Sequence, residues 1–152
     1  MASPPGHGSL RKGCHSQPGG IYLVTFTTTA RRPLFADFDL ACAASRTFET
    51  SAAAEAAALL CWVLMPDHFH GLLRLDGARG LSQAVQRLKS RSSFACASAG
   101  TTPPVWARAF HDHALRRDED VLRTARYIIA NPIRAGIVER VRAYPFWNAI
   151  WL

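Results

Sequence analysis

Hydrophobic residues gather in three segments of the first half of the chain, and each segment predicts a β-strand. Residues 21–29 are dense in β-branched and aromatic side chains, which favours a strand. Residues 60–65 form a short apolar run that stops at Pro66-Asp67, and residues 68–75 follow directly. Because only that short turn separates the last two segments, they are predicted to pair as an antiparallel hairpin.

Helical patterns separate and follow these strands. Residues 37 to about 59 are alanine-rich and open with acidic side chains, which favours a helix. In residues 81–97 the apolar positions recur with the spacing of one helix face. Residues 118 to about 130 begin with three acidic side chains, as a helix N-terminus prefers, and Asn131-Pro132 is predicted to end or kink that helix.

The remaining segments complete a predicted architecture. Residues 105–115 are predicted to be extended, so the element order is β-α-β-β-α-β-α. That order predicts an α+β domain built on a mainly antiparallel sheet with helices packed on it. Residues 1–19 are rich in Gly, Pro, Ser and His and are predicted to be an irregular basic segment, so residues 20–152 form the folded domain.

The composition adds a preference for polyanionic partners. The chain has 152 residues, 49% of them hydrophobic, and a formal net charge of +7. Residues 1–35 and residues 79–91 each carry four basic side chains and no acidic one, a distribution that fits a nucleic-acid-binding surface and a generic solvated surface equally well. The four cysteines form no CxxC pair, and neither a signal peptide nor a membrane span is visible. We therefore expect no membrane partner and a cytoplasmic location.

Two histidines at alternate positions are the first candidate for chemistry. In a strand, His68 and His70 project from the same face, where their imidazoles can share one divalent metal, while Phe69 packs into the opposite face. The alternative is a pair of strand histidines with ordinary hydrogen-bond partners. A second such pair, His111 and His113, could supply an accessory metal ligand or a phosphate contact, and only His113 is retained for that role.

A tyrosine and an asparagine four residues apart are the second candidate. On a helix, Tyr127 and Asn131 lie on one face. A tyrosine oxygen can form a covalent intermediate, although the phenol is a weak nucleophile because its pKa is ~10. Nearby arginines are candidates for contacts with a DNA backbone, namely Arg123, Arg126 and Arg134. The alternative is a helix tyrosine whose ring packs and whose hydroxyl reaches water.

Several segments taken together resemble one family. They are GGIYLVTFTTTARRPLF (19–35), WVLMPDHFHGLLRL (62–75), VWARAFHDHALRRDEDV (105–121) and ARYIIANPIRAGIV (125–138). In this order they resemble the REP-associated tyrosine transposases, a branch of the single-tyrosine HUH transposases. The resemblance spans about residues 10–147 and implies a compact antiparallel sheet flanked by helices, of the ferredoxin-like HUH endonuclease type.

The resemblance also implies roles for individual residues. His68 and His70 occupy the His-hydrophobic-His motif, whose histidines bind a divalent cation, Mg²⁺ or Mn²⁺. Tyr127 falls on the nucleophile, and Asn131 falls where relatives place a polar third metal ligand. The implied activity is cleavage and rejoining of single-stranded DNA next to a palindromic hairpin, through a 5′-phosphotyrosine.

The implied partner is single-stranded or hairpin DNA, bound by a monomer or a homodimer. The leading segment with Arg11 and Lys12 matches the family's basic N-terminal segment, and Arg87 and Lys89 belong to the second basic stretch. Two other functions fit the residues. A metal-dependent phosphodiesterase that uses water would keep the two histidines and not need Tyr127. A nucleic-acid-binding module would use the basic residues alone.

Overall fold

The computed structural model describes residues 19–116 and 119–151, and its centre is a five-stranded sheet. Every neighbouring pair of strands in the sheet is antiparallel, and the strand order is β4-β1-β3-β2-β5. The strands are β1 (Ile21–Thr27), β2 (Ala57–Met65), β3 (His68–Leu75), β4 (His111–Ala114) and β5 (Trp147–Ala149). The predicted α+β class with an antiparallel sheet is confirmed.

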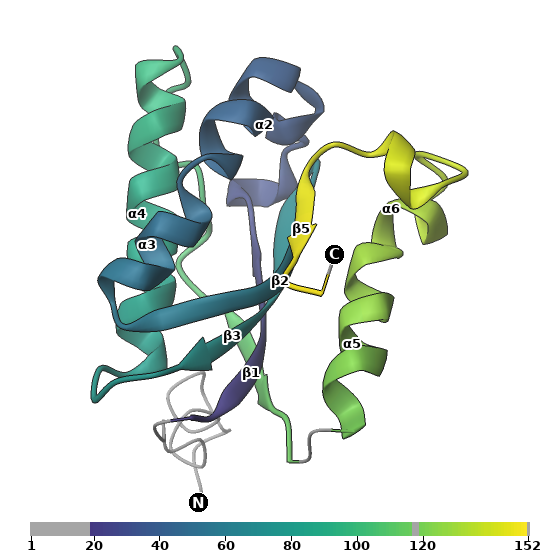
Figure 1. Cartoon of the computed structure of the whole chain (residues 1–152). Helices are drawn as coiled ribbons and strands as arrows, with labels where there is room; N and C mark the ends of the chain where they lie inside the picture. The colour runs from purple at the N-terminus through teal and green to yellow at the C-terminus, as the bar shows by residue number, and fades with distance from the viewer. Residues whose placement is uncertain (1–18, 117–118, 152) are drawn as a thin grey trace, which may run out of the picture.

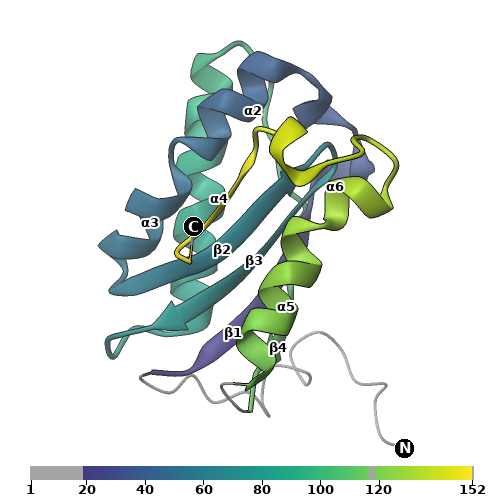
Figure 2. The same ribbon diagram turned by 45° about the vertical axis from the view of Figure 1, so that its right-hand side comes forward.

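Helices cover both faces of this sheet (Figure 1). Helices α2, α3 and α4 lie on one side, and α5 and α6 lie on the other, where α5 contacts β2 and β3. Figure 2 shows α5 running along the sheet on its own side. The α-helices are α2 (Phe38–Ser45), α3 (Phe48–Ala54), α4 (Leu81–Ser98), α5 (Glu119–Ile129) and α6 (Asn131–Arg134), and short 3₁₀ turns occur at Thr29–Arg31, Leu34–Ala36 and Val141–Ala143. Among the described residues, no helix combines the length and the apolarity needed to cross a bilayer.

The hairpin of β2 and β3 places the predicted histidines. The two strands are joined by Pro66-Asp67, as predicted, and β3 lies between β1 and β2. The Phe69 ring packs among Phe26, Phe48 and Trp62 on the side of α3. Because side chains alternate along a strand, His68 and His70 project from the other face, which is the side of α5.

The single helix predicted over residues 37–59 is wrong. The structure has two short helices there, and β2 already begins at Ala57. Between the helices, the Thr47 hydroxyl donates to the Ala44 carbonyl, a local bond that competes with a continuous helix. Ala56 then adopts a left-handed conformation with φ of 52°, which ends the second helix and turns the chain into β2.

The extended segment predicted over residues 105–115 is only partly a strand. Trp106 makes an isolated bridge to Thr28, and β4 covers His111–Ala114 alone. Between them, the Lys89 ammonium donates to the carbonyls of Ala107 and Ala109, which draws this backbone toward α4. The sequence also gave no signal for β5, whose three residues pair with β2.

The break predicted at Asn131-Pro132 is present. Helix α5 ends at Ile129, and α6 begins at Asn131 with Pro132 in its first turn. Proline suits that position because the first amide groups of a helix have no intrahelical partner. The break sets Asn131 on a new helical turn directly after α5, close to the histidine face.

Candidate metal and nucleophile site

His68 and His70 form one side of the candidate site. Their ring centroids lie 6.3 Å apart, and both rings are on the α5 side of the central strand. The partners of His68 are close on both nitrogens: Asp67 Oδ1 lies 2.8 Å from Nδ1, and Asn131 Nδ2 lies 3.3 Å from Nε2. The two residues predicted as metal ligands on different elements, His68 and Asn131, are therefore in contact.

One ring nitrogen of His70 has no hydrogen-bond partner among the described residues. This nitrogen, Nε2, is buried. Burial, followed by repulsion from His68 and Arg134, lowers the pKa of His70 to about 4. The imidazole is therefore neutral at physiological pH, and a neutral imidazole is the form that binds a metal.

Helix α5 supplies the other side of the site. Val121, Ala125 and Ile128 are buried at helical spacing and hold α5 against the sheet. That orientation leaves Tyr127 57% exposed, whereas the other two tyrosines of the chain, Tyr22 and Tyr144, are buried. One tyrosine is thus accessible to a substrate, and two pack in the core.

Arg134 interacts with both Tyr127 and His70. Its guanidinium carbon lies 3.7 Å from the centroid of the Tyr127 ring, a cation–π contact. Its charge also contributes to the lowered pKa of His70. The arginine predicted to contact a DNA backbone therefore lies against the Tyr127 ring and close enough to His70 to affect its charge, where it could neutralise a bound phosphate.

The donors present here fit a divalent cation. His70 Nε2 is buried without a hydrogen-bond partner among the described residues, and His68 Nε2 contacts the polar amide of Asn131. Within residues 19–116 and 119–151 no cluster of three or more His, Cys, Asp or Glu side chains has metal-binding geometry. Two imidazoles would therefore need an oxygen donor such as the Asn131 amide, which would have to turn by half a rotation to present Oδ1.

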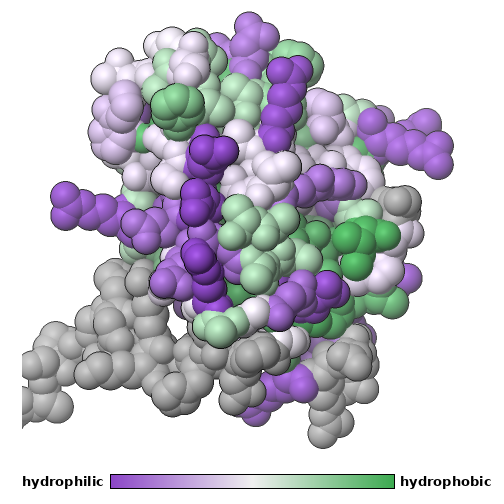
Figure 3. Space-filling model, turned by 60° about the vertical axis from the view of Figure 1, so that its left-hand side comes forward, coloured by the Kyte–Doolittle hydropathy of each residue, from purple (hydrophilic) through white to green (hydrophobic). Residues whose placement is uncertain are grey.

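The other predicted DNA-binding residues are spread over the molecule. Arg123 and Arg126 are exposed on α5, on the same helix as Tyr127. Arg11 and Lys12 lie outside the described residues. Arg87 and Lys89 are on α4, which lies across the sheet from α5 (Figure 1). The side of the molecule seen in Figure 3 carries both hydrophilic and hydrophobic side chains. The structure thus does not bring the basic residues to one side.

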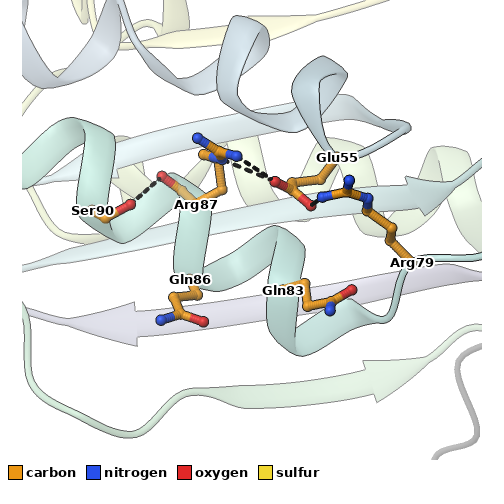
Figure 4. A pocket seen from close by; sticks show the side chains of 6 residues that line it. All are labelled: Glu55, Arg79, Gln83, Gln86, Arg87 and Ser90. Carbon is orange, nitrogen blue, oxygen red and sulfur yellow. Dashed lines mark hydrogen bonds and ion pairs between the residues drawn. The ribbon is translucent and has the colours of Figure 1, made fainter.

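Arg87 and Lys89 are also engaged in contacts within the protein. Arg87 and Arg79 bind the carboxylate of Glu55, each at 2.8 Å, in a polar pocket on the flank of α4 (Figure 4). The Glu55 side chain is only 4% exposed, so these ion pairs fasten the end of α3 to α4. Lys89 binds the carbonyls of residues 107–109. Both side chains therefore contribute to the fold through these contacts.

Glu55→Gln is expected to flatten the acid side of the stability profile. Hydrogen bonds from Arg79 and then from Arg87 hold the pKa of Glu55 below its usual value of 4.5. The pairing therefore stabilises the fold above that value, and the contribution is lost as the pH falls through the lowered folded pKa. Urea unfolding between pH 7 and pH 3 should show a steeper loss in the wild type than in Glu55→Gln. Parallel profiles would contradict this assignment.

The accessory histidine of the prediction lies away from the site. His111, not His113, is level with His70, because Thr25 of β1 pairs with both of them. One strand separates the two histidines, so their backbones are about 10 Å apart. His113 pairs with Leu23, two residues farther along the strands.

Asp67 and Arg31 are the residues at this site that the sequence reasoning missed. The sequence pattern identifies Asp67 only as part of a turn and Arg31 only as part of a basic stretch. Partial burial opposes ionisation of Asp67, but hydrogen bonds with His68 and Arg31 outweigh it and lower the pKa of the carboxyl group. An acid directly before the first histidine was the available signal.

Comparisons with known proteins identify related sequences. The family model described as IS200-like transposase matches residues 17–130. The REP-associated tyrosine transposase of Escherichia coli K12 is 30% identical over 86 residues, which cover 56% of this chain and 50% of that protein. The match thus spans half the length of this curated relative.

A solved structure extends the similarity to the fold. A REP-associated tyrosine transposase bound to a REP hairpin superposes with a TM-score of 0.70 and 21% sequence identity. The superposition covers 97% of this chain and 82% of the other. At that identity the likeness establishes the fold alone, while the family model covers most of the sequence. The chain belongs to the IS200-like transposase family.

Proposed function

We propose that this transposase cuts and rejoins single-stranded DNA beside a hairpin, and that Tyr127 carries the DNA as a 5′-phosphotyrosine. The observation that carries the proposal is the exposed Tyr127 ring, on the helix that leads directly to the contact between Asn131 and His68. A structurally similar protein is described as bound to a REP hairpin, which supports hairpin DNA as the partner here.

The covalent step follows from the chemistry of the phenol. The Tyr127 oxygen attacks the phosphorus while the bond from phosphorus to the 3′ oxygen breaks. The phenolic proton passes to solvent, and the departing 3′ oxygen takes up a proton, which leaves a 5′-phosphotyrosine and a free 3′-hydroxyl. One phosphoester replaces another, so a second 3′-hydroxyl can reverse the step and join two strands without an external energy source.

The surrounding residues would hold and neutralise the phosphate. His68, His70 and Asn131 would hold Mg²⁺ or Mn²⁺, which supplies charge neutralisation at the scissile phosphate when bound. Arg134 lies over the Tyr127 ring and restricts its orientation. The same guanidinium places a positive charge against the ring that carries the attacking oxygen, and it would oppose the negative charge that develops on the phosphate oxygens. Arg123 and Arg126 extend the positive surface along the exposed side of α5.

Covalent capture tests the proposal. The protein is incubated with Mn²⁺ and an end-labelled single strand that carries a hairpin, then denatured and separated by electrophoresis. We expect a labelled protein–DNA adduct that falls to background when EDTA replaces Mn²⁺, because the phosphate charge is then no longer neutralised. A matched strand with a scrambled hairpin controls for sequence-independent cleavage.

Other outcomes point to the two alternative functions. Cleavage that leaves no adduct under any quenching time would indicate a phosphodiesterase that uses water. Retention of the labelled strand without cleavage, with either metal, would indicate a binding module. Either result would overturn the proposed function.

A further inference from the structure

The turn between β2 and β3 is bound from two directions. On one side, Asp67 Oδ1 lies 2.8 Å from His68 Nδ1. On the other side, Arg31 donates to Asp67 Oδ2 through Nε at 3.2 Å and Nη2 at 3.0 Å. The Asp67 carboxylate therefore bridges an arginine of the loop after β1 and the first histidine of the site.

These contacts determine which nitrogen of His68 carries the proton. A carboxylate paired with a guanidinium is ionised and can only accept hydrogen bonds, so the proton of a neutral imidazole must be on Nδ1. Nε2 then carries a lone pair. The contact of Asn131 Nδ2 with that atom agrees, because an amide NH₂ group can only donate.

We propose that Asp67 is a positioning residue, which fixes His68 in the Nδ1–H tautomer and directs the Nε2 lone pair toward the metal position. The inference rests on the proposed function for its purpose, although the tautomer exists without metal or DNA. A carboxylate behind a metal-binding histidine sets both ring orientation and basicity, and loss of such a partner weakens metal binding by roughly 10- to 100-fold.

The loop after β1 is shaped to hold this carboxylate. Ala30 and Arg31 both have positive φ, 55° and 52°, which non-glycine residues adopt at an energetic cost. The Thr28 amide donates to the Asp67 carbonyl at 2.9 Å, so the loop contacts both the backbone and the side chain of Asp67. Such a double attachment restricts the direction in which the carboxylate faces His68.

Nitrogen NMR of histidine-labelled, metal-free protein at about pH 8 distinguishes the two neutral tautomers of an imidazole. Comparison with His68→Gln assigns the His68 signals. We expect the Nδ1–H pattern for His68 in the wild type and the Nε2–H pattern in Asp67→Ala. An Nε2–H pattern in the wild type, or an unchanged pattern in Asp67→Ala, would overturn the proposal. The wild-type spectrum alone decides if the variant does not fold.

Calorimetric titration with Mn²⁺ alone provides the second readout. Asp67→Ala should bind Mn²⁺ about 10- to 100-fold more weakly than the wild type. Asp76→Ala is the matched control, because Asp76 is also a surface carboxylate paired with an arginine, Arg74, at the far end of β3. Equal weakening in both variants would show a general charge effect and contradict a specific role of Asp67.

The outcomes separate this inference from the proposed function. If the wild type forms no DNA adduct but shows the Nδ1–H tautomer and Asp67-dependent Mn²⁺ binding, the transposition chemistry fails and the role of Asp67 stands. If the adduct forms and the tautomer is Nε2–H, the proposed function stands and the role of Asp67 fails.

Discussion

Tyr127→Phe is expected to abolish the covalent protein–DNA adduct, with a loss of at least about 10³-fold, the scale seen when an enzyme loses its nucleophile. Phenylalanine keeps the ring over which Arg134 stacks and removes only the oxygen that would attack phosphorus. Because the ring is exposed, the substitution should leave the free energy of unfolding nearly unchanged. Denaturing electrophoresis with labelled hairpin DNA gives the adduct yield, and urea unfolding checks the fold.

Tyr144→Phe is the control for this experiment. The Tyr144 hydroxyl is buried and donates to the Leu64 carbonyl, so it faces the core and not a DNA strand. Its loss should reduce stability and leave the adduct in place. A wild-type yield of adduct from Tyr127→Phe would refute the assignment of the nucleophile.

Phe69→Ala is expected to lower the free energy of unfolding by about 3–5 kcal/mol, as for other buried aromatic residues that are truncated to alanine. The Phe69 ring is fully buried, stacks on Phe26 with centroids 4.7 Å apart and contacts Phe48. It also lies over Gly71, where a Cβ atom would come within 3.0 Å of the ring. The alanine variant leaves a cavity between the sheet and α3, directly behind the two histidines.

Phe94→Ala provides the comparison on α4. Phe94 is 72% exposed, so its truncation should change the free energy of unfolding by no more than about 0.5 kcal/mol. Urea unfolding of both variants, followed by tyrosine and tryptophan fluorescence, measures the difference. Similar stabilities for the two variants would mean that the core does not form around Phe69 as described.

The sequence predicted the strands of the centre better than the elements around them. The paired strands were predictable because both segments are rich in apolar residues and only Pro66-Asp67 separates them. The break in the predicted helix at residues 37–59 was not, because it depends on one threonine hydroxyl and on a left-handed Ala56. Strand β5 has three residues and forms only because β2 offers it an edge.

In the site too, the features that depend on local spacing were predictable, and those that depend on tertiary packing were not. Alternation placed His68 and His70 on one face, and the break after Ile129 brought Asn131 close to them. Spacing alone does not show that Arg134 stacks on Tyr127 or that Arg87 is held by Glu55, because these pairs depend on how helices pack. Basic residues assigned to DNA from charge alone therefore divide into exposed ones and ones with partners in the protein.

Peptide mapping of the trapped adduct tests the central claim most directly. After nuclease digestion of the DNA and cleavage with trypsin, residues 127–134 form one peptide that contains Tyr127 but no serine, threonine, histidine or cysteine. The assignment of Tyr127 as the nucleophile predicts that mass spectrometry finds the residual nucleotide mass on this peptide, with fragment ions that assign it to Tyr127. Nucleotide mass on any other peptide, or cleaved DNA with no modified peptide, would contradict it.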